Sequence, residues 1–133
     1  MCGILSQVSP RAVDVESFSQ ALDCLKTRGP DGRGLWLSQD QRVALGHRRL
    51  AIVDAAGGQQ PIFDEENDIV AVVNGEFYDH ALLRIRLQSL GYRFRSHSDS
   101  EVLIHLYRHY GLECLQFLRG EFAWILYDVG QRK

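Results

Sequence analysis

Short apolar stretches separated by polar turns run through the whole chain, and their spacing predicts a mixture of strands and helices. Residues 3–8 alternate in the way that is typical of a strand. Apolar residues then recur at helical spacing over 14–27. The helical set is Val15, Phe18, Leu22 and Leu25. The segment 28–32, Arg-Gly-Pro-Asp-Gly, must form a turn that ends this helix.

A hairpin and a buried strand are predicted next. Residues 35–37 and 43–47 have the composition of two strands, and 38–41 would join them as a hairpin loop. Residues 54–61 are loop-like. The continuous β-branched run 69–73 is typical of a strand that is buried on both faces.

The second half predicts two helices with short extended segments around them. Asp79 can cap a helix that runs to about Leu90, and Gly91 would end it. The period of this helix is set by Leu82, Leu83, Arg86 and Leu90. The remaining predicted elements are a strand at 92–95, a helix over 101–110 ended by Gly111, a helical turn at 113–118 and a buried strand at 121–127.

These elements predict one α+β domain over residues 1–133. The strands run mostly in hairpins with a helix pair inserted, which favours stacked layers of antiparallel sheet and helix. No repeat or linker interrupts the pattern. The chain stops soon after its last predicted strand, so we expect a sheet that lacks further strands and an exposed edge through which copies could self-associate.

Composition narrows the function classes. With 45% hydrophobic and 24% charged residues, a net charge of -2 and a pI near 6.2, the chain offers no electrostatic case for nucleic acid or an anionic membrane. No apolar run approaches the ~20 residues of a membrane span, and no signal peptide is visible. Three cysteines argue against a disulfide framework and fit a reducing cytoplasm, and no zinc-ligand spacing occurs.

Cys2 is the first candidate for chemistry. Removal of Met1 would place a thiol and a free α-amine on one residue, and that amine titrates at roughly pH 7.7–8.0. One terminal residue could therefore supply both nucleophile and base. The alternative is that Cys2 is a small apolar residue at the start of a buried strand.

Three later segments could complete such a site. The adjacent Arg48 and Arg49 offer bidentate donors for a carboxylate, or form a solvated face. Asn74 and Gly75 supply the two donors of an oxyanion hole, or form a hairpin turn. Asp99 could bind an ammonium group, or cap the helix that follows. Together they describe a receptor for an amino acid with a reactive side-chain amide.

The chain also resembles the N-terminal glutaminase domain of the class II glutamine amidotransferases, which are N-terminal-nucleophile hydrolases, and within them the glutamine-hydrolysing asparagine synthetases. The resemblance covers residues 1 to about 129. It rests on the motifs Cys2-Gly3-Ile4, Arg28-Gly29-Pro30-Asp31, Arg49-Leu50-Ala51-Ile52-Val53-Asp54, Gln60-Pro61, Asn74-Gly75-Glu76-Phe77-Tyr78 and Ser98-Asp99-Ser100-Glu101-Val102.

The resemblance implies an αββα sandwich of two antiparallel sheets flanked by helices, and a role for each motif. Cys2 would be the nucleophile, and Asn74 with Gly75 would form the oxyanion hole. Arg49 would bind the glutamine carboxylate and Asp99 its ammonium group. The pocket would be lined by Leu50, Ala51, Ile52, Val53 and Glu76. Arg48 would be structural.

The resemblance also sets the expected partners. L-glutamine would be the substrate, and a synthetase domain or another acceptor enzyme would receive the ammonia. ATP and Mg²⁺ would belong only to that second domain, whose pyrophosphate loop is not found in these residues, so no cofactor is expected here. The family has His where Thr27 stands and Asn where Asp79 stands. A non-catalytic fragment that binds glutamine or a partner chain is the rival reading.

Overall fold

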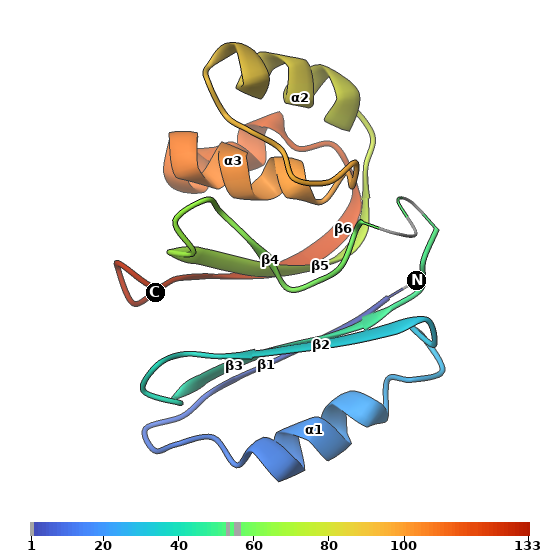
Figure 1. Cartoon of the computed structure of the whole chain (residues 1–133), viewed down its shortest axis with the longest axis vertical. Coiled ribbons are helices and arrows are strands. Elements are labelled where there is room, and N and C mark those ends of the chain that lie inside the picture. Colours follow the sequence, from blue (N-terminus) through green and yellow to red (C-terminus); the bar gives the residue numbers. More distant parts are fainter. Residues whose placement is uncertain (1, 53, 55–56) are drawn as a thin grey trace.

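The structure is a computed structural model that describes residues 2–52, 54 and 57–133. Its elements form four layers: one helix, two antiparallel sheets face to face, and a second layer of helices (Figure 1). In the described residues each sheet has three strands. The α+β fold with an αββα layer order is therefore confirmed.

The first sheet has the order β1-β3-β2 and is covered on its outer face by α1 (Figure 1). Its strands are β1 (Gly3–Val8), β2 (Gly32–Leu37) and β3 (Val43–Arg49), and its helix is α1 (Val15–Asp23). The carboxylate of Asp14 caps α1 by accepting the N–H groups of Glu16 and Ser17. This helix is shorter than the predicted 14–27, because tighter turns follow Asp23.

The second sheet has the order β4-β5-β6, and α2 and α3 cover its outer face (Figure 1). Its elements are β4 (Ile62–Phe63), β5 (Ile69–Phe77), α2 (His80–Ser89), α3 (Glu101–Tyr110), the 3₁₀ helix η1 (Gly111–Phe117) and β6 (Gly120–Asp128). The predicted buried run 69–73 is confirmed, since each of its residues is at most 2% exposed. It lies in the middle strand of the sheet, which explains its continuous apolar pattern.

Three apolar layers hold the fold together, one in each interface between the stacked elements. Phe18 and Ala44 belong to the layer between α1 and the first sheet. Leu45 of the first sheet meets Val70 and Val72 of the second. The largest layer packs α2, α3 and η1 onto the second sheet. Burial of these side chains supplies about 25 cal/mol per Å² of apolar surface removed from water.

Some predicted elements are wrong in ways that have physical causes. Residues 92–95 form no strand, because no other segment in the described chain pairs with them. In α2 the buried residues are Leu83 and Leu87, whereas Leu82 is 69% and Leu90 47% exposed. The four-residue spacing of Leu83 and Leu87 therefore marks the inward face.

The last predicted strand exists but is less buried than expected. Glu121 and Ala123 are exposed, and most other side chains of β6 are only half-buried. Within the described residues β6 pairs with β5 alone, so it lies at an edge of its sheet. The expectation of further strands beyond this edge stays a prediction.

Candidate active site

A pocket of about 220 Å³ opens where the start of β1 meets the last third of β5. It is lined by Cys2, Arg49, Leu50, Ile52, Gly58, Gln60, Val73, Asn74, Gly75, Glu76, Tyr78, Ser98, Asp99, Ser100 and Glu121. The first sheet contributes Cys2 and Arg49, and the second contributes the residues of β5 and β6. Most of the residues predicted from the motifs therefore meet in one cavity.

Cys2 lies directly before β1 and is held by the backbone of the segment after β3. Its Sγ accepts a hydrogen bond from the N–H of Leu50 at 3.3 Å and lies 3.7 Å from the Leu50 carbonyl, which accepts in turn from the thiol. Arg28 Nε donates to the carbonyl of Cys2 at 3.3 Å. Cys2 is half-buried and in contact with the cavity, so it is not an enclosed core residue.

The Arg28-Gly29-Pro30-Asp31 turn connects the nucleophile to the arginine segment. Asp31 N–H donates to the carbonyl of Arg49, and Asp31 Oδ2 accepts from the N–H of Ala51, both at 2.9 Å. A Cβ on Gly29 would lie 2.2 Å from the carbonyl carbon and oxygen of Arg48, so only glycine fits. The hydrogen bonds of this motif therefore connect Cys2 to the segment 48–51.

The two adjacent arginines have different roles, because neighbouring residues of a strand point to opposite faces. Arg48 is buried and its guanidinium donates to Asp23 of α1 at 2.5 Å, away from the pocket. Arg49 lines the pocket, and its guanidinium donates to the carbonyl of Asp54. Arg49 therefore lies at the pocket and Arg48 does not, while the binding of a ligand carboxylate by Arg49 stays a prediction.

Asp54 links the arginine segment to the loop that carries Asp99. Its Oδ1 accepts from the N–H of Gly57 at 2.9 Å, and its Oδ2 accepts from the N–H of His97 at 2.8 Å. The hydrogen bonds from His97 and Gly57 hold the pKa of the Asp54 carboxyl below its usual value. The carboxylate is therefore ionised at neutral pH and joins two loops that line the pocket.

Asn74 and Gly75 lie inside β5 and not in a turn, so the hairpin-turn alternative is wrong. They pair with Ala123 and Phe122 of β6. Gly75 has φ +142°, and a Cβ there would lie 2.1 Å from the carbonyl oxygen of Glu121. The Oδ1 of Asn74 is buried and has no hydrogen-bond partner among the described residues. Buried polar groups are normally satisfied, so Asn74, which lines the pocket, has an acceptor oxygen that is still available.

Asp99 does not cap α3, so that alternative is also wrong. The N-cap position of α3 is Ser100, which makes no side-chain capping bond. The buried Asp99 carboxylate lines the pocket, and its Oδ2 accepts from the N–H of Phe77 at 2.9 Å. Its other oxygen has only Ser100 Oγ, at 3.5 Å, among the described residues. Asp99 therefore holds the end of β5 and keeps acceptor capacity toward the cavity.

Glu101 and Arg84 shape the loop before α3. Glu101 accepts from the N–H groups of Arg95 and Ser96 at 2.7 and 2.9 Å and from Ser96 Oγ at 2.6 Å. Burial raises the pKa of this carboxyl, but these donors and His105 outweigh burial and lower the pKa to about 2. Arg84 donates to the carbonyls of Ser96 and Ser98.

Acidic groups and a tyrosine form the outer wall of the pocket. Glu76 of β5 lies directly opposite Glu121 of β6. Tyr78 lies beside them and is 57% exposed. The pKa of its phenol is raised, first by partial burial and then by the negative charges of Glu121 and Glu76. Glu76 thus lies in the pocket wall as predicted.

The remaining predicted lining residues have mixed outcomes. Leu50 and Ile52 line the pocket, while Ala51 is occupied by its bond to Asp31 and is not part of the lining. Val53 lies outside the described residues. Four further residues line the pocket although no motif assigned them a role there. They are Gly58, Gln60, Tyr78 and Glu121, and only the tertiary structure brings them to the cavity.

Residues 2–52, 54 and 57–133 contain no group of three or more His, Cys, Asp or Glu side chains arranged to hold a metal ion. Across the same residues, no helix has the length and apolar character that crossing a membrane requires.

Known structures share this fold. The glutamine phosphoribosylpyrophosphate amidotransferase of B. subtilis, complexed with ADP and GMP, superposes with a TM-score of 0.81 over 97% of this chain and 35% of its own, at 20% identity. Another match, an allosteric regulatory enzyme of purine biosynthesis, has a TM-score of 0.57 over 68% of this chain and 22% of its own, at 27% identity. The chain thus shares its fold with part of the B. subtilis amidotransferase.

The sequence relationship is more specific, because the glutamine amidotransferase domain family matches residues 1–133. The chain belongs to this family. It is 45% identical to amidase chry2 of Gibberella zeae over 90% of this chain, and 41% identical to asparagine synthetase [glutamine-hydrolyzing] 2 of Oryza sativa over 97%. A probable asparagine synthetase [glutamine-hydrolyzing] of Schizosaccharomyces pombe is 42% identical over 100% of the chain. The chain spans only 18–24% of the length of these three relatives.

Proposed function

We propose that this chain hydrolyses L-glutamine to glutamate and ammonia and supplies the ammonia to an acceptor half of the asparagine-synthetase type. The observation that carries the proposal is that a thiol, an arginine, a buried aspartate and an Asn-Gly pair line one pocket. Family membership supports the same reaction class.

The substrate would be oriented by its two charged ends. Arg49 would bind the α-carboxylate, with its guanidinium already fixed on the carbonyl of Asp54. Asp99 would bind the α-ammonium group with the oxygen that does not hold Phe77. The γ-amide would then reach toward Cys2 and toward Asn74 and Gly75.

The chemistry would proceed through a covalent thioester. After removal of Met1, the α-amine of Cys2 takes the thiol proton while Sγ attacks the amide carbon. The Asn74 amide and the Gly75 N–H donate to the oxyanion of the tetrahedral intermediate. The protonated amine gives its proton to the leaving nitrogen, ammonia departs, and water hydrolyses the γ-glutamyl thioester to glutamate.

The acceptor half, the energy source and the location are further proposals. We expect ATP and Mg²⁺ to act in a synthetase domain or acceptor enzyme, and the glutaminase steps above use only residues of this chain. A reducing compartment such as the cytoplasm suits a reaction that needs a free thiol, and Cys2, Cys24 and Cys114 are all unpaired in the structure.

The direct test is the release of glutamate and ammonia from L-glutamine by the wild type and by Cys2→Ala. We expect Cys2→Ala to abolish release while glutamine still binds. A diazo-ketone analogue of glutamine should label Cys2 in the wild type. Cys24→Ala is the matched control, because Cys24 is an exposed free thiol outside the pocket, and its activity should equal the wild type. A label on Cys24 or Cys114, or glutamine binding by the wild type without ammonia release, would refute the proposed mechanism.

The terminal-amine mechanism also requires processing. We expect intact-mass spectrometry of natively expressed protein to show a mass without Met1. A protein that retains Met1 and still hydrolyses glutamine would contradict the role of the α-amine.

A further inference from the structure

The backbone of β5 is anchored by different partners along its side that faces away from β6. Successive residues of an antiparallel strand direct their N–H and C=O groups to alternate sides. Tyr78 N–H bonds to Arg119 on the β6 side, so the odd-numbered residues face the other side. On that side Ile69 is hydrogen-bonded to Asp64, and Ala71 pairs with β4. Farther along the strand, the N–H of Phe77 donates to the carboxylate of Asp99.

Between these anchors, Val73 is held by side chains where a neighbouring strand would be expected. Its N–H donates to Gln60 Oε1 at 2.6 Å, and its carbonyl accepts from Gln60 Nε2 at 3.1 Å. The primary amide of Gln60 thus replaces the peptide group of a missing strand, since β4 ends its pairing at Ala71. By the same alternation the N–H of Gly75 points between Gln60 and Asp99, toward the pocket that Gly75 lines.

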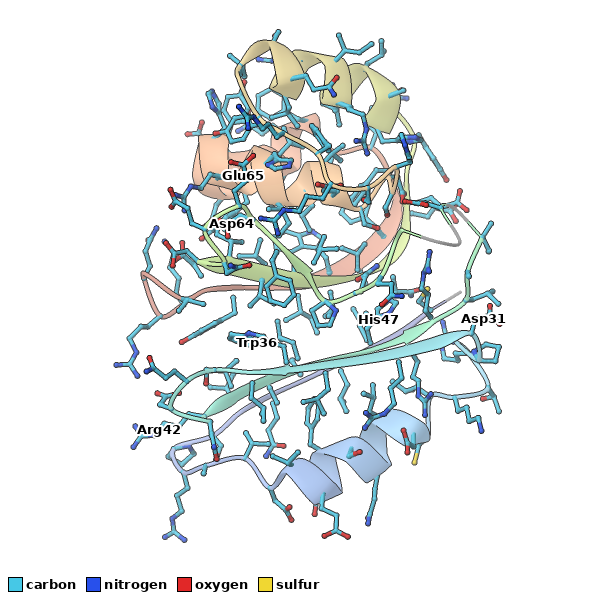
Figure 2. All side chains as sticks on the ribbon, in the orientation of Figure 1. Asp31, Trp36, Arg42, His47, Asp64 and Glu65 are labelled. Atoms are coloured by element: carbon cyan, nitrogen blue, oxygen red, sulfur yellow. The ribbon has the colours of Figure 1, made fainter. Side chains whose placement is uncertain are left out.

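The carbonyl of Val73 also receives a bond from the other sheet. His47 Nε2, on β3, lies 3.1 Å from it, and must be the donor because a carbonyl only accepts. Figure 2 shows His47 between the two sheets, near the pocket end of the molecule. The backbone of Gln60 lies against Gly34 of β2, where a Cβ would be 1.8 Å from the Gln60 carbonyl oxygen. Both contacts therefore connect Val73 to the first sheet, whose β1 begins beside Cys2.

We propose that Gln60, supported by His47, is a positioning residue that sets the place of the oxyanion donors relative to Cys2. Cys2 belongs to the first sheet, and Asn74 and Gly75 belong to the second. The two hydrogen bonds of Gln60 hold the residue next to Asn74 at a fixed distance from the first sheet. The inference rests on the proposed glutaminase function and adds a residue for which the motifs indicated no role.

The test uses substitutions that alter one or both hydrogen bonds of Gln60. In Gln60→Glu at pH 8, the ionised carboxylate keeps the Val73 N–H but places an acceptor against the Val73 carbonyl. In Gln60→Met, a side chain of similar length makes neither bond. Small displacements of reacting groups are costly, so we expect kcat to fall about tenfold or more in both variants, with KM for glutamine within about twofold.

The pH dependence separates positioning by hydrogen bonds from a general loss of packing. Lowering the pH protonates the carboxylate introduced by Gln60→Glu, and its O–H can then donate to the Val73 carbonyl as the amide does. The ratio of variant to wild-type kcat should therefore rise as pH falls for Gln60→Glu and stay flat for Gln60→Met. The ionisable groups around position 60 are Cys2, His47, Arg49, Glu76, Tyr78, Asp99 and Glu121. The α-amine of Cys2 belongs to the same set. All of these groups are also present in Gln60→Met, which therefore serves as the reference for pH effects that do not come from the introduced carboxylate.

Gln59→Glu is the matched control, since Gln59 is exposed beside Gln60 and is not part of the pocket lining; its kinetics should equal the wild type. Amide hydrogen exchange at Val73 adds a readout independent of activity, and both Gln60 variants should accelerate it. Normal kcat and normal exchange in Gln60→Met would overturn the inference. A wild type without glutaminase activity would refute the proposed function, and the exchange measurement would then still decide whether Gln60 anchors β5.

Discussion

At the scale of single residues, three polar side chains that line the pocket, Cys2, Arg49 and Asp99, each make a hydrogen bond to the backbone as well. Cys2 is bonded to the backbone of Leu50, Arg49 to the carbonyl of Asp54, and Asp99 to the N–H of Phe77. Such bonds restrict the rotamers of these side chains before any ligand binds. The positions of these three side chains are therefore largely fixed by the protein itself.

The Asn74 amide is expected to act in the transition state. Asn74→Ala should lower kcat about 10²-fold or more and change KM little, because an oxyanion donor acts on charge that develops during the reaction. Steady-state kinetics with glutamine check this. Full turnover in Asn74→Ala would contradict the oxyanion role.

Asp99 is expected to act mainly in binding. Asp99→Asn removes the negative charge offered to the substrate ammonium, so KM should rise more than kcat falls. A buried charged partner is worth about 2–5 kcal/mol, which corresponds to a rise in KM of about 30-fold or more. Asp68→Asn, at an exposed carboxylate outside the pocket, is the control and should leave both constants unchanged. An unchanged KM in Asp99→Asn would assign the ammonium to another group.

At the scale of elements, the loop between α2 and α3 has no regular structure, yet side-chain hydrogen bonds hold it in place. Glu101 accepts three hydrogen bonds from Arg95 and Ser96, Arg84 donates to two carbonyls, and Asp54 accepts from His97. The first turn of α3 and the loop 91–100 thus form one unit that carries Asp99. The alternating residues at 92–95 do not predict this arrangement, because the loop backbone is bonded to side chains and not to a neighbouring strand.

Removing a hydrogen bond of Glu101 should weaken substrate binding, although Glu101 itself does not line the pocket. Glu101→Gln replaces an acceptor oxygen by an NH₂ group that faces donors, so we expect KM for glutamine to rise severalfold and the free energy of unfolding to fall by about 1–3 kcal/mol. Glutaminase kinetics and thermal melting measure the two effects. Glu113→Gln, at an exposed carboxylate of η1, should change neither. Unchanged KM in Glu101→Gln would show that the hydrogen bonds of Glu101 are not needed to position Asp99.

At the scale of the whole molecule, the pocket is built across the interface of the two sheets. Cys2 lies directly before β1 of the first sheet, and Asn74 and Gly75 belong to β5 of the second, with an apolar layer of Leu45, Val70 and Val72 between the two sheets. Next to that layer lies a buried titratable group, His47, which is 1% exposed. The pKa of His47 is lowered to about 4, mainly by burial. The positive charge of Arg49 also lowers this pKa, while the hydrogen bond to Val73 acts in the opposite direction.

This buried histidine should make the protein less stable in mild acid. Its folded pKa lies below the ordinary value of 6.5, so the unfolded chain binds the proton more tightly. The stabilisation is complete above pH 6.5 and is lost as pH falls toward about 4, by at most about 3 kcal/mol. Glu101 follows with the same sign at lower pH, from about 4.5 down to about 2.

Denaturant unfolding at pH 7, 5.5 and 4.5 checks the role of His47. His47→Gln keeps a donor for Val73 but does not titrate, so its free energy of unfolding should decline less than that of the wild type between pH 6.5 and 4.5. His97→Gln, at an exposed imidazole, is the control and should follow the wild type. A His47→Gln variant with the wild-type decline would remove His47 as the cause.

The sequence by itself determined the local elements, the α+β class and the identity of the chemical groups. Apolar periodicity depends on neighbours along the chain, so β1, β3, the buried part of β5 and α3 were predictable from spacing alone. The motifs also indicated Cys2, Arg49 and Asp99, because their chemistry is a property of the side chain.

The tertiary structure excluded one alternative for two of the ambiguous motifs. Asn74-Gly75 is extended and not a turn, because β6, which lies far along the chain, pairs with it. Asp99 bonds to Phe77 of β5 and not to its own helix. Gln60 and His47 meet at Val73 only when the two sheets stack. Such contacts join residues far apart in the chain, so no local pattern of apolar and polar positions contains them.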